Sequence, residues 1–367
     1  MKIQHTHYHT LWISPDDPEV IKVIDQRLLP FRLVIRNLKT SGEVYRAIRE
    51  MWVRGAPLIG VAAAYGVYLG LLELRGENDM QQKIRQLAHF LKSARPTAVN
   101  LQYAVDLVVQ GIESFPTLAE KREQALQLAN QLKAREIENC RQIGEHGLPL
   151  IEQISRKKKG KPVNILTHCN AGWLACIDYG TATAPIYLAH QKGIKIHVWV
   201  DETRPRNQGA RLTAYELGEE GVPHTVIADN TGGLLMQKDM VDMVIVGSDR
   251  TSANGDVANK IGTYLKALAA HDNKIPFYVA LPLSSIDWEI TDGMREIPIE
   301  ERDEDEVKTI EGWHHHQITR VRLTPENSPA LNYGFDVTPA KYVTALITEK
   351  GICKASKQAM EKLRDET

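Results

Sequence analysis

The sequence is short of cysteine and carries almost no net charge. Only four of its 367 residues are cysteines, and none belongs to a C-x-x-C pair. This scarcity argues against a disulfide framework and a cysteine-based zinc site, and it favours a reducing cytoplasm. The 45 lysines and arginines balance 46 aspartates and glutamates, so no field over the whole chain attracts nucleic acid or an anionic membrane. An anionic ligand must therefore be bound by local groups.

Long hydrophobic runs are also scarce. The N-terminal sequence MKIQHTHYHT has no apolar core of the kind that marks a secretory signal. The longest apolar run, residues 57–74, reaches about the minimum length of a membrane span, but it is rich in alanine and glycine and contains two tyrosines. We therefore expect a buried core helix and no membrane association.

The N-terminal part of the chain has the periodicity of helices. Short strands are expected at residues 33–35 and in the alternating histidines His5, His7 and His9, with a turn at residues 25–30. The expected helices span residues 43–51, 57–74, 80–92, 101–112 and 119–143. This pattern predicts a mostly helical N-terminal domain with a small sheet.

After Pro162 the pattern changes to short β-branched runs that alternate with helices. The expected strands are residues 163–167, 194–200, 224–228, 243–247 and 277–281, and the helices between them are 184–191, 209–218, 233–238 and 257–270. Helices of this length can cross over between parallel strands, so the alternation predicts an α/β, Rossmann-like, doubly wound sheet. The solvated segment SRKKKGKP, residues 155–162, places the boundary between domains of residues 1–155 and 156–367.

Ligands of such sheets bind outside the carboxyl ends of the strands, so the residues after each strand are the candidates. They are mostly polar, and one crevice is expected to receive them all. A capping or loop role explains any single one of them equally well. The candidates are His168, Cys169, Asn170, Asp201, Glu202, Arg204, Asp229, Asn230, Ser248, Asp249, Arg250, Ser284 and Ser285.

Two of these residues suit proton transfer or nucleophilic chemistry. Cys169 follows a buried strand at an expected strand-to-helix turn, where a helix start or a nearby cation would favour its thiolate. An inert buried cysteine is the alternative, and it fits Cys176 better. Asp249 ends the segment MVIVGSDR, where partial burial would raise its pKa toward the range of a general acid. An ion pair with Arg250 is the alternative role for Asp249.

Three glycine-containing segments are typical of helix starts that bind phosphate. They are RGAP at residues 54–57, QGAR at 208–211 and GDVANK at 255–260, and the last adds the cation Lys260. An ordinary cap is the alternative for each. Together the three segments indicate a phosphorylated sugar.

The histidines do not predict a metal site. Adjacent histidines in the triplet His314 to His316 point in different directions, and no carboxylate or cysteine lies at ligand spacing. A surface loop is expected there, and a solvated edge for His5, His7 and His9. We expect neither a metal nor a cofactor.

Several long motifs run from about residue 53 to residue 351. They are VRGAPLIGVAAAYG, SARPTAVNL, THCNAG, DETRPRNQGARLTAYEL, GSDRTSANGDVANKIGTY, VALPLSSID, PIEER and FDVTPAKYVTALITEKG. Together they resemble the methylthioribose-1-phosphate isomerase family. The resemblance implies an aldose–ketose isomerase of methionine salvage that acts on a sugar 1-phosphate as a homodimer. It also implies site residues: the family's catalytic cysteine falls on Cys169, its catalytic acid on Asp249, and its substrate contacts on Arg54, Gly55, Ala56, Arg95, Gln208, Asn259 and Lys260.

An aldose 1-phosphate is a closed acetal, so the ring must open before it can isomerise. Asp249 would donate a proton to the ring oxygen, and Cys169 would help to move hydrogen from C2 to C1 through an enediol. A hydride shift in a dry cavity is the competing route, and the sequence leaves both open.

The resemblance extends to isomerases of 5-deoxyribose 1-phosphate and ribose 1,5-bisphosphate, and to noncatalytic regulatory subunits of a translation initiation exchange factor. Cys169 and Asp249 together favour an enzyme. Two features depart from the family pattern: Ser248 stands where alanine is expected, and residues 313–322 lengthen a loop. We find no second cationic cluster for a phosphate at C5, unless Arg320 or Arg322 of that loop folds over the site.

Overall fold

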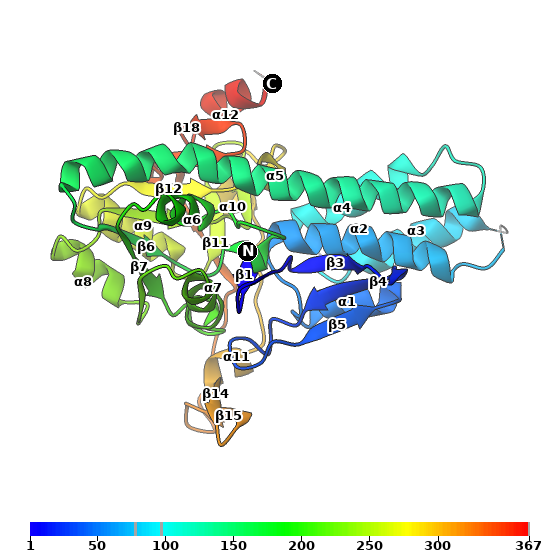
Figure 1. Ribbon diagram of the computed structural model, residues 1–367, viewed down its shortest axis with the longest axis horizontal. Coiled ribbons are helices and arrows are strands. Elements are labelled where there is room, and N and C mark those ends of the chain that lie inside the picture. The colour runs from blue at the N-terminus through cyan, green and yellow to red at the C-terminus, as the bar shows by residue number, and fades with distance from the viewer. Residues whose placement is uncertain (77–78, 96–97, 366–367) are drawn as a thin grey trace.

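The computed structural model describes residues 1–76, 79–95 and 98–365. A helical N-terminal half and a half built on a large parallel sheet lie side by side, and one long helix, α5 (Leu118–Lys158), runs along both of them (Figure 1). The architecture predicted from the sequence is confirmed in its main features.

Helix α2 is the centre of the N-terminal half. It packs against α1, α3, α4 and α5, because nearly all of its side chains are apolar and buried. It is long and apolar enough to cross a membrane, but 89% of it is buried inside the protein, which is typical of a core helix. The helices of this half besides α5 are α1 (Ser41–Arg49), α2 (Ala56–Glu73), α3 (Met80–Lys92) and α4 (Val99–Gly111).

The small sheet exists, but its strands differ from those expected. It is antiparallel, in the order β3-β4-β5, with β3 at Leu11–Ser14, β4 at Asp17–Ile24 and β5 at Ile35–Leu38. The histidine alternation instead belongs partly to a short hairpin of β1 (Lys2–Ile3) and β2 (Thr6–His7). Strand β4 buries Val20, Ile21, Val23 and Ile24, a pattern without strict alternation that conceals it in the sequence.

Helix α5 continues beyond the expected end at Ile143. Gly144 and Gly147 interrupt the apolar pattern, and a Cβ atom at Gly147 would lie 2.5 Å from Cγ of Pro185. The glycines therefore allow close packing on α6 (Ala184–Gln191). The expected domain boundary after residue 155 falls in the last turn of α5 and stays a prediction.

The large sheet has the strand order β18-β17-β12-β9-β6-β7-β8. All its pairs are parallel except the one with β18. From β6 the chain adds β7 and β8 on one side and then β9, β12 and β17 on the other, so the strand order reverses between β6 and β9, as in a doubly wound fold. The strands are β6 (Val163–Thr167), β7 (Ile196–Asp201), β8 (His224–Ile227), β9 (Met243–Val246), β12 (Phe277–Ala280), β17 (Ala345–Thr348) and β18 (Gly351–Cys353).

Each face of this sheet has its own core. Ile165 of β6 packs in the cluster that contains Ile143 of α5 and Ile186 of α6, whereas Leu166 packs with Leu235 of α8 and others. Consecutive strand residues point to opposite faces, which explains the division. The remaining helices are η1 (Trp173–Ala175), α7 (Ala214–Glu219), α8 (Thr231–Gln237), α9 (Thr263–Asp272), η3 (Leu283–Ser285), α10 (Gly293–Glu296), α11 (Asp305–Lys308), η4 (Ala340–Tyr342) and α12 (Lys357–Asp365).

The helix expected at residues 257–270 is wrong in its first part. Val257–Lys260 is the buried strand β11, and α9 begins only after Gly262, whose φ is +102°. Cross-strand pairing with β10 and β16 decides this conformation. The helix expected at 209–218 begins with a π-helical turn, η2 (Gly209–Thr213). The second sheet has the order β13-β10-β11-β16, with β10 at Arg250–Ser252, β13 at Ile286–Asp287 and β16 at Phe335–Thr338.

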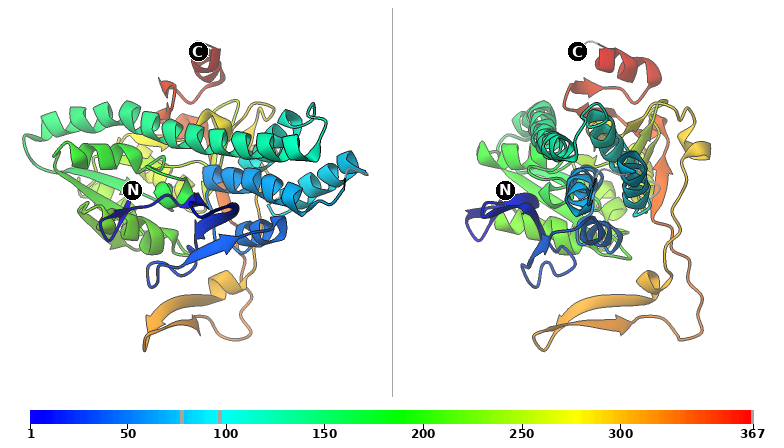
Figure 2. Two further views of the ribbon diagram at one scale, coloured as in Figure 1. Left: turned by 45° about the vertical axis from the view of Figure 1, so that its right-hand side comes forward. Right: turned by 90° about the vertical axis from the view of Figure 1, so that its right-hand side faces the viewer.

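A hairpin projects from the body of the molecule (Figure 2). It consists of β14 (Thr309–His314) and β15 (Gln317–Arg322), so the expected surface loop is an ordered antiparallel pair. Its Trp313 stacks on Phe31 with ring centroids 5.5 Å apart, and Arg32 Nη2 donates to the His316 carbonyl at 3.0 Å. The hairpin thus connects the sheet half with the N-terminal half.

Candidate active site

A cavity lies beside β6 and β9, where the strand order of the large sheet reverses. Cys169 follows β6 and Asp249 follows the adjacent strand β9, so both residues lie at carboxyl ends beside the switch point, the usual ligand position of this architecture. All nine residues predicted for the site line the cavity: Arg54, Gly55, Ala56, Arg95, Cys169, Gln208, Asp249, Asn259 and Lys260. The lining includes side chains from both halves of the molecule.

The start of α2 forms one wall of the cavity. Gly55 is its N-cap residue with φ +94°, and a Cβ atom there would lie 2.2 Å from the carbonyl oxygen of Ala175. Only glycine fits this close approach. The helix start expected from the RGAP segment is therefore present, and it turns the positive end of the α2 dipole toward the cavity.

Cys169 is held by its backbone. Its φ is +66°, its N–H donates to Thr203 Oγ1 at 2.8 Å, and its carbonyl accepts from Thr213 Oγ1 at 2.7 Å. The helix expected directly after it is replaced by the short turn η1, which begins only at Trp173. Burial raises the pKa of the Cys169 thiol, and the cations Arg54 and Lys260 oppose that shift. Nearby cations, rather than a helix start, are thus the groups that favour its thiolate.

Asp249 and Lys260 both line the cavity and interact through their charges. The protein around Asp249 raises the pKa of its carboxyl through desolvation, and Lys260, Arg95 and Arg54 partly offset this effect. Burial lowers the pKa of the Lys260 ammonium, while Cys169 and Asp249 raise it. A carboxyl group with a raised pKa suits a general acid.

Arg54 is positioned by a buried network. Its Nη1 donates to Oδ1 of Asn170 and its Nη2 to the Asn170 carbonyl, both at 2.6 Å. The Asn170 amide nitrogen donates in turn to Thr213 and to Glu216. Glu216 is fully buried, and burial raises the pKa of its carboxyl to about 7. One amide side chain therefore fixes the guanidinium that faces the cavity.

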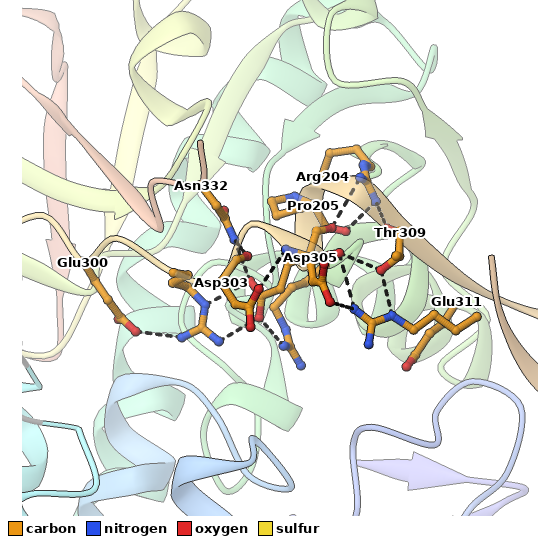
Figure 3. A network of polar contacts seen from close by, with 12 residues as sticks. Arg204, Pro205, Glu300, Asp303, Asp305, Thr309, Glu311 and Asn332 are labelled. Atoms are coloured by element: carbon orange, nitrogen blue, oxygen red, sulfur yellow. Dashed lines mark hydrogen bonds and ion pairs between the residues drawn. The ribbon is translucent and has the colours of Figure 1, made fainter. Parts of the chain in front are cut away.

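Arg95 belongs to a chain of alternating charges. Figure 3 shows the part of this network between Glu300 and the base of the hairpin. Arg95 Nη2 lies 3.2 Å from Oε2 of Glu300, and Arg302 donates to the other Glu300 oxygen at 2.7 Å. Arg302 also bonds Glu306, whose carboxylate lies 2.7 Å from Arg206 Nη1. This chain connects the cavity with the base of the β14–β15 hairpin.

A second network lies behind Cys169. His168 Nδ1 lies 2.9 Å from Asp201 Oδ2, and its Nε2 lies 2.8 Å from the carbonyl of Ile261. Lys266 Nζ is 3.3 Å from the same Asp201 oxygen. His168 therefore joins the ends of β6 and β7 to the turn that follows β11. Lys260 is the last residue of β11.

The strand-end residues do not all reach one crevice, as was expected. Among the described residues, the cavity lining includes His168, Asn170 and Ser248 besides Cys169 and Asp249. Five of the others contact neighbouring segments instead. Arg204 donates to carbonyls at the hairpin base, and Asp229 accepts from the N–H groups of Thr203 and Arg204. Arg250 faces Asp287, and Ser284 and Ser285 contact Asn100. Capping and loop roles account for these residues.

The remaining sequence predictions are met in part. Gln208 lies just before η2, as the QGAR segment suggested, but Asn259 and Lys260 reach the cavity from strand β11 and not from a helix start. Ser248 Oγ lies 2.9 Å from Thr251 Oγ1. The sequence did not indicate Phe335, Glu216 or Glu300. Phe335 lines the cavity, and the centroid of its ring lies 5.0 Å from Lys260 Nζ. Glu216 and Glu300 act through contacts with Asn170 and Arg95, and Phe335 is apolar, so no pattern of chemical groups in the sequence marks these three residues.

The fold and the site define a doubly wound α/β protein with a cation-lined cavity for a small anionic molecule at its topological switch point. Comparison with known families narrows this class. The chain belongs to the Initiation factor 2 subunit family, whose model matches residues 52–355.

Curated relatives match along almost the whole chain. A methylthioribose-1-phosphate isomerase of Desulfatibacillum aliphaticivorans is 55% identical over 363 residues, which is 99% of this chain and 98% of the relative. One of Escherichia coli O45:K1 is 51% identical and covers 98% of this chain and 95% of its own length.

Two solved structures share the fold over nearly all of both chains. The 5-methylthioribose 1-phosphate isomerase of Pyrococcus horikoshii has a TM-score of 0.84 at 36% identity and covers 100% of each chain. A structure described as the delta subunit of translation initiation factor eIF-2B from A. fulgidus has a TM-score of 0.79 at 36% identity and covers 98% of this chain and 100% of its own.

Proposed function

We propose that the protein is an aldose–ketose isomerase that converts 5-methylthioribose 1-phosphate to 5-methylthioribulose 1-phosphate in methionine salvage. The names of relatives that are 51–58% identical support this reaction. The observation that carries the proposal is the meeting of Cys169 and Asp249 in one cavity with Arg54, Arg95 and Lys260. This set combines groups for moving hydrogen with cations for a phosphate.

Substrate binding depends on the start of α2. The 1-phosphate would accept hydrogen bonds from Arg54 and from backbone N–H groups at Gly55 and Ala56, where the helix dipole also favours an anion. Gln208 Oε1 is buried and has no hydrogen-bond partner among the described residues. Such an acceptor is costly unless a donor reaches it, and a sugar hydroxyl supplies one.

Ring opening requires an acid. Protonated Asp249 would donate its proton to the ring oxygen while the bond between that oxygen and C1 breaks, and the electron pair of the bond goes to the oxygen. The raised pKa of Asp249 keeps a larger share of this carboxyl protonated at neutral pH than an exposed aspartate would have.

Hydrogen then moves from C2 to C1 by one of two routes. In the enediol route the Cys169 thiolate takes the C2 proton, the electron pair forms the C1–C2 double bond, and a proton returns to C1 as the C2 hydroxyl loses its proton. In the hydride route the C2–H electron pair moves directly to C1, and a base takes the hydroxyl proton. Burial raises the pKa of Cys169, which leaves the hydride route open.

The test of the proposal is turnover on three substrates side by side: the 5-methylthio, 5-deoxy and 5-phospho ribose 1-phosphates. Turnover of the methylthio sugar supports the proposal. Turnover of none of them would leave the noncatalytic subunits that share this fold as the alternative. With substrate deuterated at C2, deuterium retained at C1 indicates the hydride route, and loss to solvent indicates the enediol.

We also infer a symmetric homodimer in the cytoplasm, which the resemblance to the isomerase family supports. Light scattering on the purified chain should give a mass near twice 41.3 kDa. A mass near 41.3 kDa across working concentrations contradicts the dimer.

A further inference from the structure

Three groups from the N-terminal segment converge on one buried carboxylate. Asp178, which is 5% exposed, follows the turn η1. Its Oδ1 accepts from the amino group of Met1 at 2.5 Å. Its Oδ2 lies 2.9 Å from Nε2 of His7 and 3.5 Å from Nε2 of His9. Two imidazoles thus share one oxygen of the same side chain.

The spacing of these atoms is that of a metal-ligand set. One ligand atom from each of His7, His9 and Asp178 lies within 4.8 Å of the other two. Zinc bonds of about 2.0–2.1 Å at tetrahedral angles place neighbouring ligand atoms roughly 3.3 Å apart. The two nitrogen–oxygen distances of 2.9 and 3.5 Å bracket this value. Little movement is therefore needed to seat an ion between the three side chains.

Solvent can reach the two histidines of this cluster. The imidazoles keep their access to solvent, with 59% of the His7 side chain and 28% of the His9 side chain exposed, so an ion can enter.

The other histidine–carboxylate cluster among the described residues does not share these features. It consists of His168, Asp201 and Asp229, but both ring nitrogens of His168 already have partners. His168 and Asp201 are also only 1% and 0% exposed, so an ion reaches them less easily than it reaches His7 and His9. The comparison leaves the N-terminal cluster as the candidate.

We propose that His7, His9 and Asp178 form a binding site for a single zinc ion that joins the N-terminal hairpin to the segment after η1. Two imidazoles and a carboxylate are typical zinc ligands, whereas magnesium prefers oxygen ligands alone. The site leaves a fourth position to water. The site lies outside the Cys169 cavity and joins two segments that are far apart in the sequence.

The experiment is a calorimetric titration of the full chain, without an affinity tag, with Zn²⁺ alone. We expect one ion per chain, no comparable heat with Mg²⁺, and a higher midpoint of thermal unfolding with Zn²⁺. His7→Gln and His9→Gln should each weaken binding at least tenfold. Asp178→Asn should do the same, and the two histidine variants keep the test valid if that variant fails to fold.

His5→Gln is the matched control, because His5 lies in the same segment but outside the cluster. It should bind as the unmodified chain does, and so should the triple variant His314→Gln, His315→Gln and His316→Gln. Zinc binding that persists in both His7→Gln and His9→Gln would place the ion elsewhere, for example at Cys169, and would overturn the proposal. The absence of binding in the unmodified chain would overturn it too.

Discussion

The two halves of the molecule contribute different kinds of group to the cavity. The N-terminal half provides Arg54, Arg95 and the start of α2, which are groups that hold an anion. The sheet half provides Cys169 and Asp249, whose pKa values burial raises, which are groups that transfer hydrogen. The sheet half also contributes the binding residues Gln208 and Lys260, so substrate binding depends on both halves and hydrogen transfer on the sheet half alone. Mutations should therefore separate the two roles.

The largest expected effect lies in the sheet half. Cys169→Ser and Asp249→Asn should each lower kcat at least about a hundredfold, the usual loss when a positioned acid or base is removed, while the fold survives. Steady-state kinetics and circular dichroism on the pure variants check this. Cys176→Ser is the control, because Cys176 is buried in the cavity wall and is expected only to pack. Near-normal turnover of either active-site variant contradicts the role given to that residue.

The next effect tests what the N-terminal half can bind. Ribose 1,5-bisphosphate should be used at least about a hundredfold less efficiently than the methylthio sugar, because an unpaired phosphate is costly to bury. Arg27, Arg206 and Arg211, which line a smaller cavity beside the site, already bond carboxylates. Arg320 and Arg322 are not part of the Cys169 cavity lining among the described residues.

The matched substrate is 5-deoxyribose 1-phosphate, whose kcat/KM should fall only modestly. It loses apolar contacts of about 1–3 kcal/mol. Comparable kcat/KM values for the bisphosphate and the methylthio sugar would show that the arginines beside the site release their partners to bind a second phosphate.

A smaller effect is expected from Arg54→Gln. Loss of a charged hydrogen bond to the phosphate costs about 1.5–3 kcal/mol, so KM should rise roughly tenfold or more, with kcat changed far less. Arg85→Gln, an exposed residue of α3 in the same half, is the control and should leave both constants unchanged. A fall in kcat as large as that of Cys169→Ser would mean that the two halves do not divide the work in this way.

The smallest expected effect concerns stability alone. Burial raises the pKa of Glu136 in α5 to about 7. The folded state then holds a proton that the unfolded state has released, so the unfolding free energy falls as pH rises from about 4.5 to 7 and levels off above 7. Glu136→Gln should reduce this fall by about 2–3 kcal/mol without changing turnover. Denaturant unfolding at pH 5 and pH 8 measures it, with the exposed Glu123→Gln as control. If the unfolding free energy of Glu136→Gln depends on pH as that of the unmodified chain does, the raised pKa of Glu136 is contradicted.

The sequence predicted the parallel strands well because β-branched runs such as those at residues 163–167 and 243–246 mark buried strands. It failed at β11, where the segment VANK contains nothing that separates it from the helix after Gly262. Pairing with β10 and β16 determines that strand. The predicted helix ended too early, at residue 143, for a related reason. Gly144 and Gly147 interrupt the apolar pattern in the sequence, but in the structure they allow close packing of α5 on α6.

The candidate site shows the same limit. Residues on long motifs could be named, because motifs such as DETRPRNQGARLTAYEL are continuous in the sequence, and the structure places these residues around one cavity. Glu216 and Glu300 lie on two of the same motifs, DETRPRNQGARLTAYEL and PIEER, but their roles were missed, because their connections to Arg54 and Arg95 depend on three-dimensional contacts. Whether the named residues have the predicted roles awaits the mutations above.

The continuity of α5 constrains how this protein can change in length. The helix has 41 residues, about 60 Å at 1.5 Å per residue, and each residue turns it by roughly 100°. One inserted residue between the surfaces that contact α2 and α6 would rotate Gly147 away from Pro185 and turn a larger side chain toward it. Insertions and deletions should therefore be tolerated in the hairpin β14–β15 and excluded from the middle of α5.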